Sequence, residues 1–266
     1  MFFNHFLHIF AAFLPGVVIL IYVYKQDHFP EPKKIVFKTF LFGCATVLGI
    51  DLLIPVLDNF SETNFKGETY YFFDSFIRAA FVEEIFKAIV IVFYCTRKSA
   101  FDEPMDGIIY GVAASLGFAA YENIHYIQYF SQKTSLIDIS LVRAFSAVPM
   151  HALCGVMMGF LITLSIFEKK HNYLNLFLAI LIPVGMHGLY NYSLGSKVVS
   201  YHIANVILFV FFLRAIYLFR DMKQRQKKGK LFHEKHYTIT VNNFIQASTS
   251  VLLIYLGLNY LVSITF

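Results

Sequence analysis

The chain has 266 residues, of which 58% are hydrophobic and 18% aromatic, with a mean hydropathy of +0.60 and a net charge of +5. Because soluble domains contain about 45–50% apolar residues, this composition excludes an ordinary soluble domain and indicates that lipid is the solvent. The positive charge does not indicate a nucleic-acid-binding protein, because the basic residues lie in short loops between apolar runs. The three cysteines lie singly inside such runs, and we interpret them as packing residues.

Apolar windows of about 20 residues, each long enough to cross a bilayer, follow one another along nearly the whole chain. No linker or low-complexity tract separates them. The sequence therefore predicts an all-α fold, a polytopic transmembrane bundle of about eight helices that forms one integral membrane domain over 1–266. The expected helices are 6–24, 35–57, 72–96, 107–130, 139–167, 173–193, 198–220 and 244–264.

The first expected helix has no Lys or Arg before it and is followed by Lys25, Lys33 and Lys34. A secretory signal peptide carries its positive charge on the other side, so we expect a retained helix with its N-terminus outside.

The remaining loops agree with this orientation, because fifteen basic residues then lie in cytoplasmic loops and three in outer loops. The cytoplasmic residues are Lys25, Lys33, Lys34, Lys38, Arg97, Lys98, Lys169, Lys170, Arg220, Lys223, Arg225, Lys227, Lys228, Lys230 and Lys235, and the outer residues are Lys66, Lys133 and Lys197. The basic segment 220–236 is expected to be a cytoplasmic loop that contacts anionic lipid, and not a nucleic-acid-binding tail.

The third expected helix carries EEIFK, residues 83–87, near its centre. A charged residue there costs roughly 2.5–3.5 kcal/mol on insertion scales. Lys87 lies one helical turn from both Glu83 and Glu84, so the pattern is compatible with a salt-bridged packing device. One lysine does not compensate two carboxylates, however, and one glutamate is therefore expected to be available as a general base.

The next two expected helices also carry polar groups in apolar surroundings. The fourth contains Glu122 and Asn123, and the fifth contains His151 with Arg143 two turns before it. A single histidine in a membrane helix is usually a hydrogen-bonded packing residue. We expect Arg143 either to orient a substrate carbonyl or to extend to the lipid headgroups.

Both of these helices contain a GxxxG motif, Gly107 to Gly111 and Gly155 to Gly159, which allows close helix packing. The sixth expected helix places His187 and Asn191 four residues apart on one face. A helix rises 1.5 Å per residue, so the position of a residue in its helix gives its depth in the membrane. In the predicted orientation the carboxylates and histidines of the four helices all lie between the outer surface and the midplane. They are therefore expected to line a single cavity that opens outward.

Four stretches resemble, in order and spacing, the motifs of the PrsW family of polytopic membrane proteases. They are EEIFK (83–87), FDEPMDGIIYGVAASLGFAAYEN (101–123), RAFSAVPMHALCGVMMG (143–159) and HGLYN (187–191). The family belongs to a superfamily with CAAX prenyl endopeptidases and bacteriocin-processing enzymes. The resemblance covers about residues 74–195, which we expect to be the catalytic helical core.

The resemblance implies an intramembrane peptidase of the bacterial cytoplasmic membrane with catalytic groups at Glu83, Glu84, Glu122, His151 and His187. It implies a supporting role for Asn191, and we expect Lys87, Asn123 and Arg143 to support the site as well. The family role is the first cut in a membrane-anchored anti-sigma factor, on its extracytoplasmic side, so the expected partner is a single-span membrane protein.

The sequence contains no HExxH, GxSG or GxGD motif, which leaves water as the nucleophile. In one mechanism Glu84 or Glu83 removes a proton from the water while the histidines and Asn191 stabilise charge. In the other, Glu84, His151 and His187 hold a divalent metal such as zinc, which lowers the pKa of the water. Both mechanisms use the same residues.

Two other classes of function share some of these features. A proton- or cation-coupled transporter also carries intramembrane Glu and His, but it is typically built from inverted repeats, and the motifs do not recur in the other half of the chain. A catalytically silent scaffold of the same superfamily would have lost a motif carboxylate or histidine, and every motif position is filled here.

Overall fold

The computed structural model of the protein describes residues 2–130, 134–228 and 235–265, and these residues form helices and no strand. The elements are α1 (Phe2–Tyr24), α2 (Lys33–Asn64), α3 (Gly67–Phe72), η1 (Phe73–Phe81), α4 (Val82–Val90), η2 (Ile91–Cys95), α5 (Pro104–Phe130), α6 (Leu136–Phe145), α7 (Ala147–Phe167), α8 (Asn172–Gly195), α9 (His202–Lys227) and α10 (Val241–Thr265). The two η elements are π-helical, and α3, η1, α4 and η2 form one continuous rod over 67–95.

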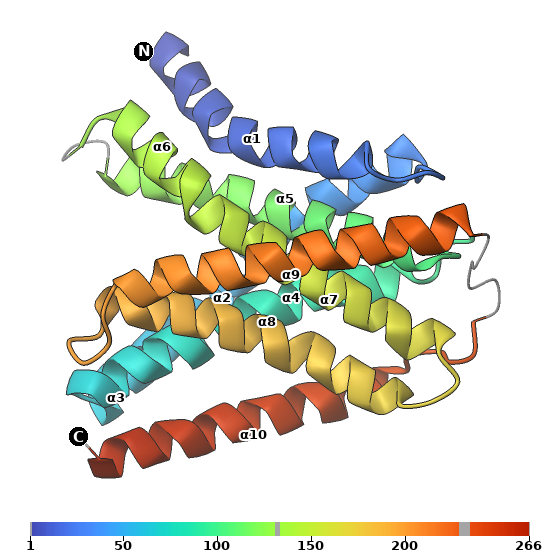
Figure 1. Ribbon diagram of the computed structural model, residues 1–266. Coiled ribbons are helices and arrows are strands. Elements are labelled where there is room, and N and C mark those ends of the chain that lie inside the picture. Colours follow the sequence, from blue (N-terminus) through green and yellow to red (C-terminus); the bar gives the residue numbers. More distant parts are fainter. Residues whose placement is uncertain (1, 131–133, 229–234, 266) are drawn as a thin grey trace.

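The helical rods lie side by side, and both termini lie at the same end of the bundle (Figure 1). Within the described residues, six helical stretches are long and apolar enough to cross a membrane, namely α1, α2, α6 with α7, α8, α9 and α10. The other two rods, 67–95 and α5, carry three of the buried acids, Glu83, Glu84 and Asp106. An all-α, multi-pass membrane bundle is thus confirmed, and an even number of rods explains why the termini share one end.

Helix α5 forms the centre of the bundle, and α1, α2 and α7 pack around it. Every residue of α5 from Pro104 to Ala120 is buried, whereas α1, α2, α9 and α10 expose large apolar side chains of the kind that face lipid. The polar groups of α5 are therefore kept away from the hydrocarbon.

The two GxxxG motifs pack against each other, with Gly107 opposite Gly159 and Gly111 opposite Gly155. A Cβ added at Gly111 would lie 2.1 Å from the carbonyl oxygen of Gly155, and one added at Gly159 would lie 1.8 Å from that of Gly107. No side chain fits at such distances, so glycine is what allows α5 and α7 to touch through their backbones. The predicted use of these motifs in close packing is confirmed.

One predicted helix is wrong in its shape. The segment expected over 139–167 is two helices, α6 and α7, separated at Ser146, whose backbone angles (φ −130°, ψ −81°) are not helical. Pro149, in the first turn of α7, has no amide hydrogen to donate to an upstream carbonyl and restricts the residue before it. The break turns α6 away from α7 and places Arg143 beside the cavity described below.

Lys133 and Lys230 lie outside the described residues. Helix α9 continues to Lys227, beyond its expected end at residue 220, so the first part of the basic segment 220–236 is helical, and residues 229–234 lie outside the described residues.

Candidate active site

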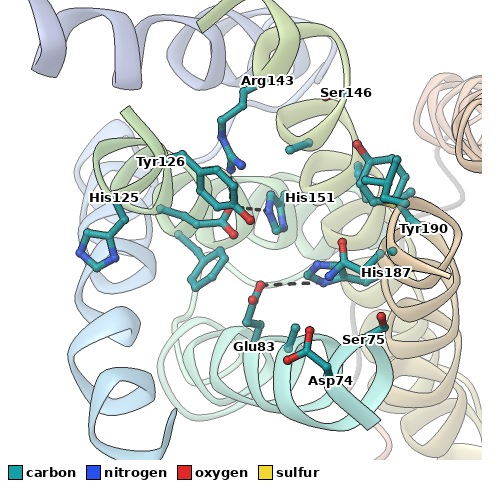
Figure 2. Close-up of a pocket in the computed structure, with 18 of the residues that line it drawn as sticks. Asp74, Ser75, Glu83, His125, Tyr126, Arg143, Ser146, His151, His187 and Tyr190 are labelled. Atoms are coloured by element: carbon teal, nitrogen blue, oxygen red, sulfur yellow. Dashed lines mark hydrogen bonds and ion pairs between the residues drawn. The ribbon is translucent and has the colours of Figure 1, made fainter. Parts of the chain in front are cut away.

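A cavity of about 870 Å³ lies among α2, η1, α4, α5, α6, α7 and α8. Figure 2 shows Glu83, His151, His187 and Arg143 pointing toward a shared space from different helices. The cavity extends to Tyr71, Thr134 and Gly195, at the end of the bundle that we expect to be extracytoplasmic. The four helices expected to contribute polar groups at one depth do therefore meet.

Glu83 and Glu84 lie in the first turn of α4, directly after the π-helical segment η1. A π turn contains an extra residue and rotates the side chains that follow it, which is one reason why such turns recur at functional sites. Lys87 Nζ lies 2.8 Å from Glu84 Oε1 and 3.6 Å from Glu83 Oε2. Glu84 and Lys87 are fully buried, whereas the Glu83 side chain is 12% exposed and lines the cavity.

His187 of α8 faces the same two glutamates. Its Nδ1 lies 2.9 Å from Glu84 Oε1 and 3.8 Å from Glu83 Oε2. Glu84 is therefore held by both Lys87 and His187, while Glu83 has longer contacts and remains adjustable. The second oxygen of Glu84 and the Oε2 of Glu83 have no hydrogen-bond partner among the described residues.

A second set of contacts runs from α7 to α6. His151 Nε2 lies 3.0 Å from Glu122 Oε2, and Glu122 also accepts a hydrogen bond from Arg143. Arg143 donates a further bond to Asn123 Oδ1, and Asn123 in turn donates to the backbone carbonyl of Ala12 in α1 at 2.9 Å. Arg143 is buried and bonded to Glu122 and Asn123, which favours a role in the site over extension to the lipid headgroups.

Lys87 joins the two sets, because its Nζ lies 3.1 Å from His151 Nδ1. The rings of His151 and His187 are 5.0 Å apart and nearly perpendicular. Asn191 lines the cavity one turn beyond His187 but makes no hydrogen bond to this network within the described residues. The structure thus brings together every expected site residue except Asn191, which lies at the margin.

Two aromatic residues to which the sequence assigned no role, Phe118 and Tyr126, support these charges. The Phe118 ring lies 4.1 Å from Lys87 Nζ and packs edge-on against His151, and the Tyr126 ring lies 3.8 Å from the Arg143 guanidinium. Cation–π contacts of this kind stabilise a cation that has been removed from water. Tyr126 follows Glu122 by four residues, and this spacing was a usable signal, whereas nothing in the sequence distinguished Phe118 from the other 30 phenylalanines.

The donor set also fits a divalent metal. One ligand atom from each of Glu83, Glu84, His151 and His187 lies within 4.8 Å of the others, and two glutamate oxygens there lack a partner. Carboxylate oxygen and imidazole nitrogen are ordinary zinc ligands. The ammonium of Lys87 already lies among these groups, so a metal would share the space with a fixed positive charge.

The comparisons agree with the motif resemblance. Residues 31–216 match the family described as PrsW family intramembrane metalloprotease. The chain is 34% identical over 184 residues to Protease PrsW of Oceanobacillus iheyensis, which covers 69% of this chain and 81% of that protein. It is 35% identical to Protease PrsW of Geobacillus kaustophilus, over 70% of this chain and 79% of that protein. It is 34% identical to Protease PrsW of Bacillus subtilis, over 69% of this chain and 81% of that protein. No solved structure is similar enough to count as a match.

Proposed function

Because this chain belongs to the PrsW family of intramembrane metalloproteases, a family of membrane peptidases, we propose that its Glu/His cavity cleaves a peptide bond of a membrane-anchored protein, on or near the extracytoplasmic side. The observation that carries the proposal is the convergence of Glu83, Glu84, Glu122, His151 and His187, from four rods of the bundle, on one cavity. Buried charge of this amount is costly in a membrane and is usually functional.

The geometry favours different roles for the two adjacent glutamates. Glu83 lines the cavity and has an oxygen with no hydrogen-bond partner, so it is the better general base toward a water molecule. Glu84 is fully buried and bonded to Lys87 and His187, which makes it the group that positions them. The contact of His151 Nε2 with Glu122 fits His151 for the role of an oxyanion donor whose position Glu122 fixes.

A bound divalent metal would supply Lewis-acid polarisation of the water and of the scissile carbonyl. Glu84, His151 and His187 would hold it, with Glu83 close enough to act as a fourth ligand or as the base. Other side chains position these groups. Arg143, which is itself bonded to Asn123, fixes the position of the Glu122 carboxylate, and the Phe118 ring excludes water from the buried side of Lys87.

For the substrate, we propose a single-span membrane protein whose cleaved segment enters from the extracytoplasmic end, with an anti-sigma factor as the first candidate. Support comes from the family membership and from the cavity, which extends to the predicted outer end of the bundle. Cleavage at that depth would begin the release of a cytoplasmic regulator.

The test is co-expression with candidate single-span proteins, followed by immunoblotting for the cleaved fragment. We expect Glu83→Gln, Glu84→Ala and His151→Ala each to lower cleavage by roughly 10²–10⁴-fold. Glu62→Gln is the matched control, because Glu62 is an exposed glutamate at the end of α2. Cleavage that persists in both Glu84→Ala and His151→Ala would remove these residues from the mechanism.

Metal content decides between the two mechanisms. If a metal acts, the purified protein should contain about one equivalent, and a chelator should abolish cleavage until zinc is restored. If cleavage is unaffected by prolonged chelation and no metal is found, the glutamate mechanism holds.

A further inference from the structure

A second group of buried acidic side chains lies at the opposite end of the bundle from the mouth of the cavity. Asp27 follows α1, Glu103 precedes α5, and Asp106 lies in the first turn of α5. In Figure 1 this is the end at which α1 runs into α2 and α9 ends. It is the end that we expect to be cytoplasmic. These residues are 8%, 2% and 0% exposed, respectively.

One carboxylate oxygen of each residue is already bonded to the protein. Gln226 of α9 donates its side-chain amide to Asp27 Oδ1 at 2.8 Å and also to Glu103 Oε1. Asp106 Oδ2 accepts the backbone N–H groups of Asp102 and Glu103, each at 2.7 Å. The three carboxylates are therefore fixed in position by α9 and by the chain that enters α5.

The other oxygen of each residue has no partner. Asp27 Oδ2, Glu103 Oε2 and Asp106 Oδ1 are all buried and make no hydrogen bond within the described residues. One ligand oxygen from each of the three lies within 4.8 Å of the others. Buried carboxylate oxygens without a donor are costly. Three such residues whose ligand atoms lie this close together can be satisfied by one shared cation.

The described part of the chain does not supply that cation. No ion pair there involves Asp27, Glu103 or Asp106. The nearby Lys235 donates instead to the backbone carbonyls of Thr96 and Lys98. A fourth acid, Glu31, accepts a hydrogen bond from Tyr110, and its carboxyl group lies beside that of Asp106.

We propose that Asp27, Glu103 and Asp106 bind a hard divalent cation of the Mg²⁺ or Ca²⁺ class at the cytoplasmic end of the protein. All the ligands are oxygens, without the nitrogen or sulfur that zinc sites use, and hard cations prefer such ligands. This site is separate from the Glu/His cavity and does not depend on the proposed function.

The cation would join segments that are distant in the sequence. Asp27 belongs to the connection between α1 and α2, Glu103 and Asp106 to the start of the central helix, and Gln226 holds the end of α9 against them. A bound cation would therefore stabilise the folded bundle by linkage, since it binds the folded chain and not the unfolded one.

The test measures binding of Mn²⁺, a paramagnetic substitute for Mg²⁺, to the purified full-length protein by electron paramagnetic resonance. Competition with Mg²⁺ and Ca²⁺ then identifies the preferred ion. Glu103→Gln and Asp106→Asn remove one ligand charge each and should weaken binding by roughly tenfold or more. Asp102→Asn is the matched control, because Asp102 is the exposed acid beside Glu103. Glu84→Gln reports on the cavity, and we expect it to leave this binding unchanged.

Thermal unfolding separates a binding role from a purely structural one. In a chelator, Glu103→Gln and Asp106→Asn should be at least as stable as the parent protein, because each relieves repulsion. At ten times the dissociation constant, Mg²⁺ should raise the Tm of the parent protein by about 3–6 °C and that of the variants by less.

The proposal is overturned if the parent protein binds no Mn²⁺ at millimolar concentration, or if Glu103→Gln and Asp106→Asn bind it as tightly as Asp102→Asn. Loss of binding in Glu84→Gln alone would assign the ion to the Glu/His cavity and would also overturn the proposal. Variants that are less stable than the parent in chelator would show that these acids are structural.

Discussion

Lys87 is the residue on which the charge balance of the cavity depends, because it contacts both glutamates and His151. Lys87→Met keeps the length of the side chain and removes its charge. We expect it to lower the free energy of unfolding by about 3–5 kcal/mol, since the carboxylates are left buried without their cation, and to abolish cleavage. Thermal or denaturant unfolding in detergent measures the loss.

The control for this variant is Lys66→Met, because Lys66 is exposed and donates only to the backbone carbonyl of Glu62. Its free energy of unfolding should stay within about 0.5 kcal/mol of the parent value. If Lys87→Met proved equally mild, the two glutamates would have to be neutral in the folded protein, and the charge balance described above would be wrong.

At this scale the sequence predicted which polar residues meet, because charges in apolar helices stand out against their surroundings. It did not predict how they pair. Glu122 is bonded to Arg143 and His151, whereas Glu84 is bonded to Lys87 and His187. Which partner each glutamate meets depends on how each helix is rotated about its own axis, and the spacing of residues in the sequence does not give that rotation. The group at Asp27, Glu103 and Asp106 was missed altogether, since its members lie near helix ends, where acidic residues are common.

Among the contacts between helices, the one between α5 and α7 tolerates the least change in side-chain size, because each helix touches the other through glycine. Gly111→Ala and Gly159→Ala should each lower the free energy of unfolding by about 1–3 kcal/mol, since the added methyl group meets a backbone carbonyl that cannot move aside. Gly257→Ala, in α10, is the matched control because nothing lies within 4 Å of the added atom. Equal effects at Gly111 and Gly257 would mean that α5 and α7 are further apart than described.

The start of α3 is tied to the connection between α8 and α9 by one carboxylate. Glu68 accepts hydrogen bonds from Tyr192 (2.8 Å), Ser196 (2.6 Å) and the backbone N–H of Lys197 (3.0 Å). Burial alone would raise the pKa of Glu68, but the bonds from Ser196, Lys197 and Tyr192 outweigh it and lower the pKa below its ordinary value.

A lowered pKa in the folded state means that Glu68 stabilises the protein above the pKa of the unfolded chain, and that this stability is lost as the pH falls through the folded value. We expect Glu68→Gln to cost up to about 1 kcal/mol at pH 7, because the carboxylate is partly exposed. The difference from the parent should shrink in acid. Unfolding measured at pH 7 and pH 4 checks this, and a difference that grew in acid would contradict it.

Helix positions were predicted within a few residues for most of the chain, since apolar length in a membrane protein directly reflects bilayer thickness. The segment 173–193 is α8 (Asn172–Gly195), and 107–130 is α5 (Pro104–Phe130). The exceptions are the ends of α2 and α9, which lie at Asn64 and Lys227 where residues 57 and 220 were expected, and the break at Ser146. A polar residue in an apolar run carries no specific signal for nonhelical backbone angles. Pro149 was the available clue.

For the molecule as a whole, the orientation in the membrane decides from which side a substrate reaches the cavity. The basic residues predict that the α7–α8 connection lies in the cytoplasm and the end of α2 outside, and the cavity extends toward the end of the bundle predicted to be outside. In a variant whose three cysteines are replaced by alanine, Thr63→Cys, an exposed position at the end of α2, should react in intact cells with a maleimide that does not cross membranes. Lys169→Cys, exposed in the α7–α8 connection, should react only after the cells are opened. The reverse pattern would make the cavity open to the cytoplasm and the acidic group at Asp106 extracytoplasmic, so that substrates cut on their outer side would no longer be candidates.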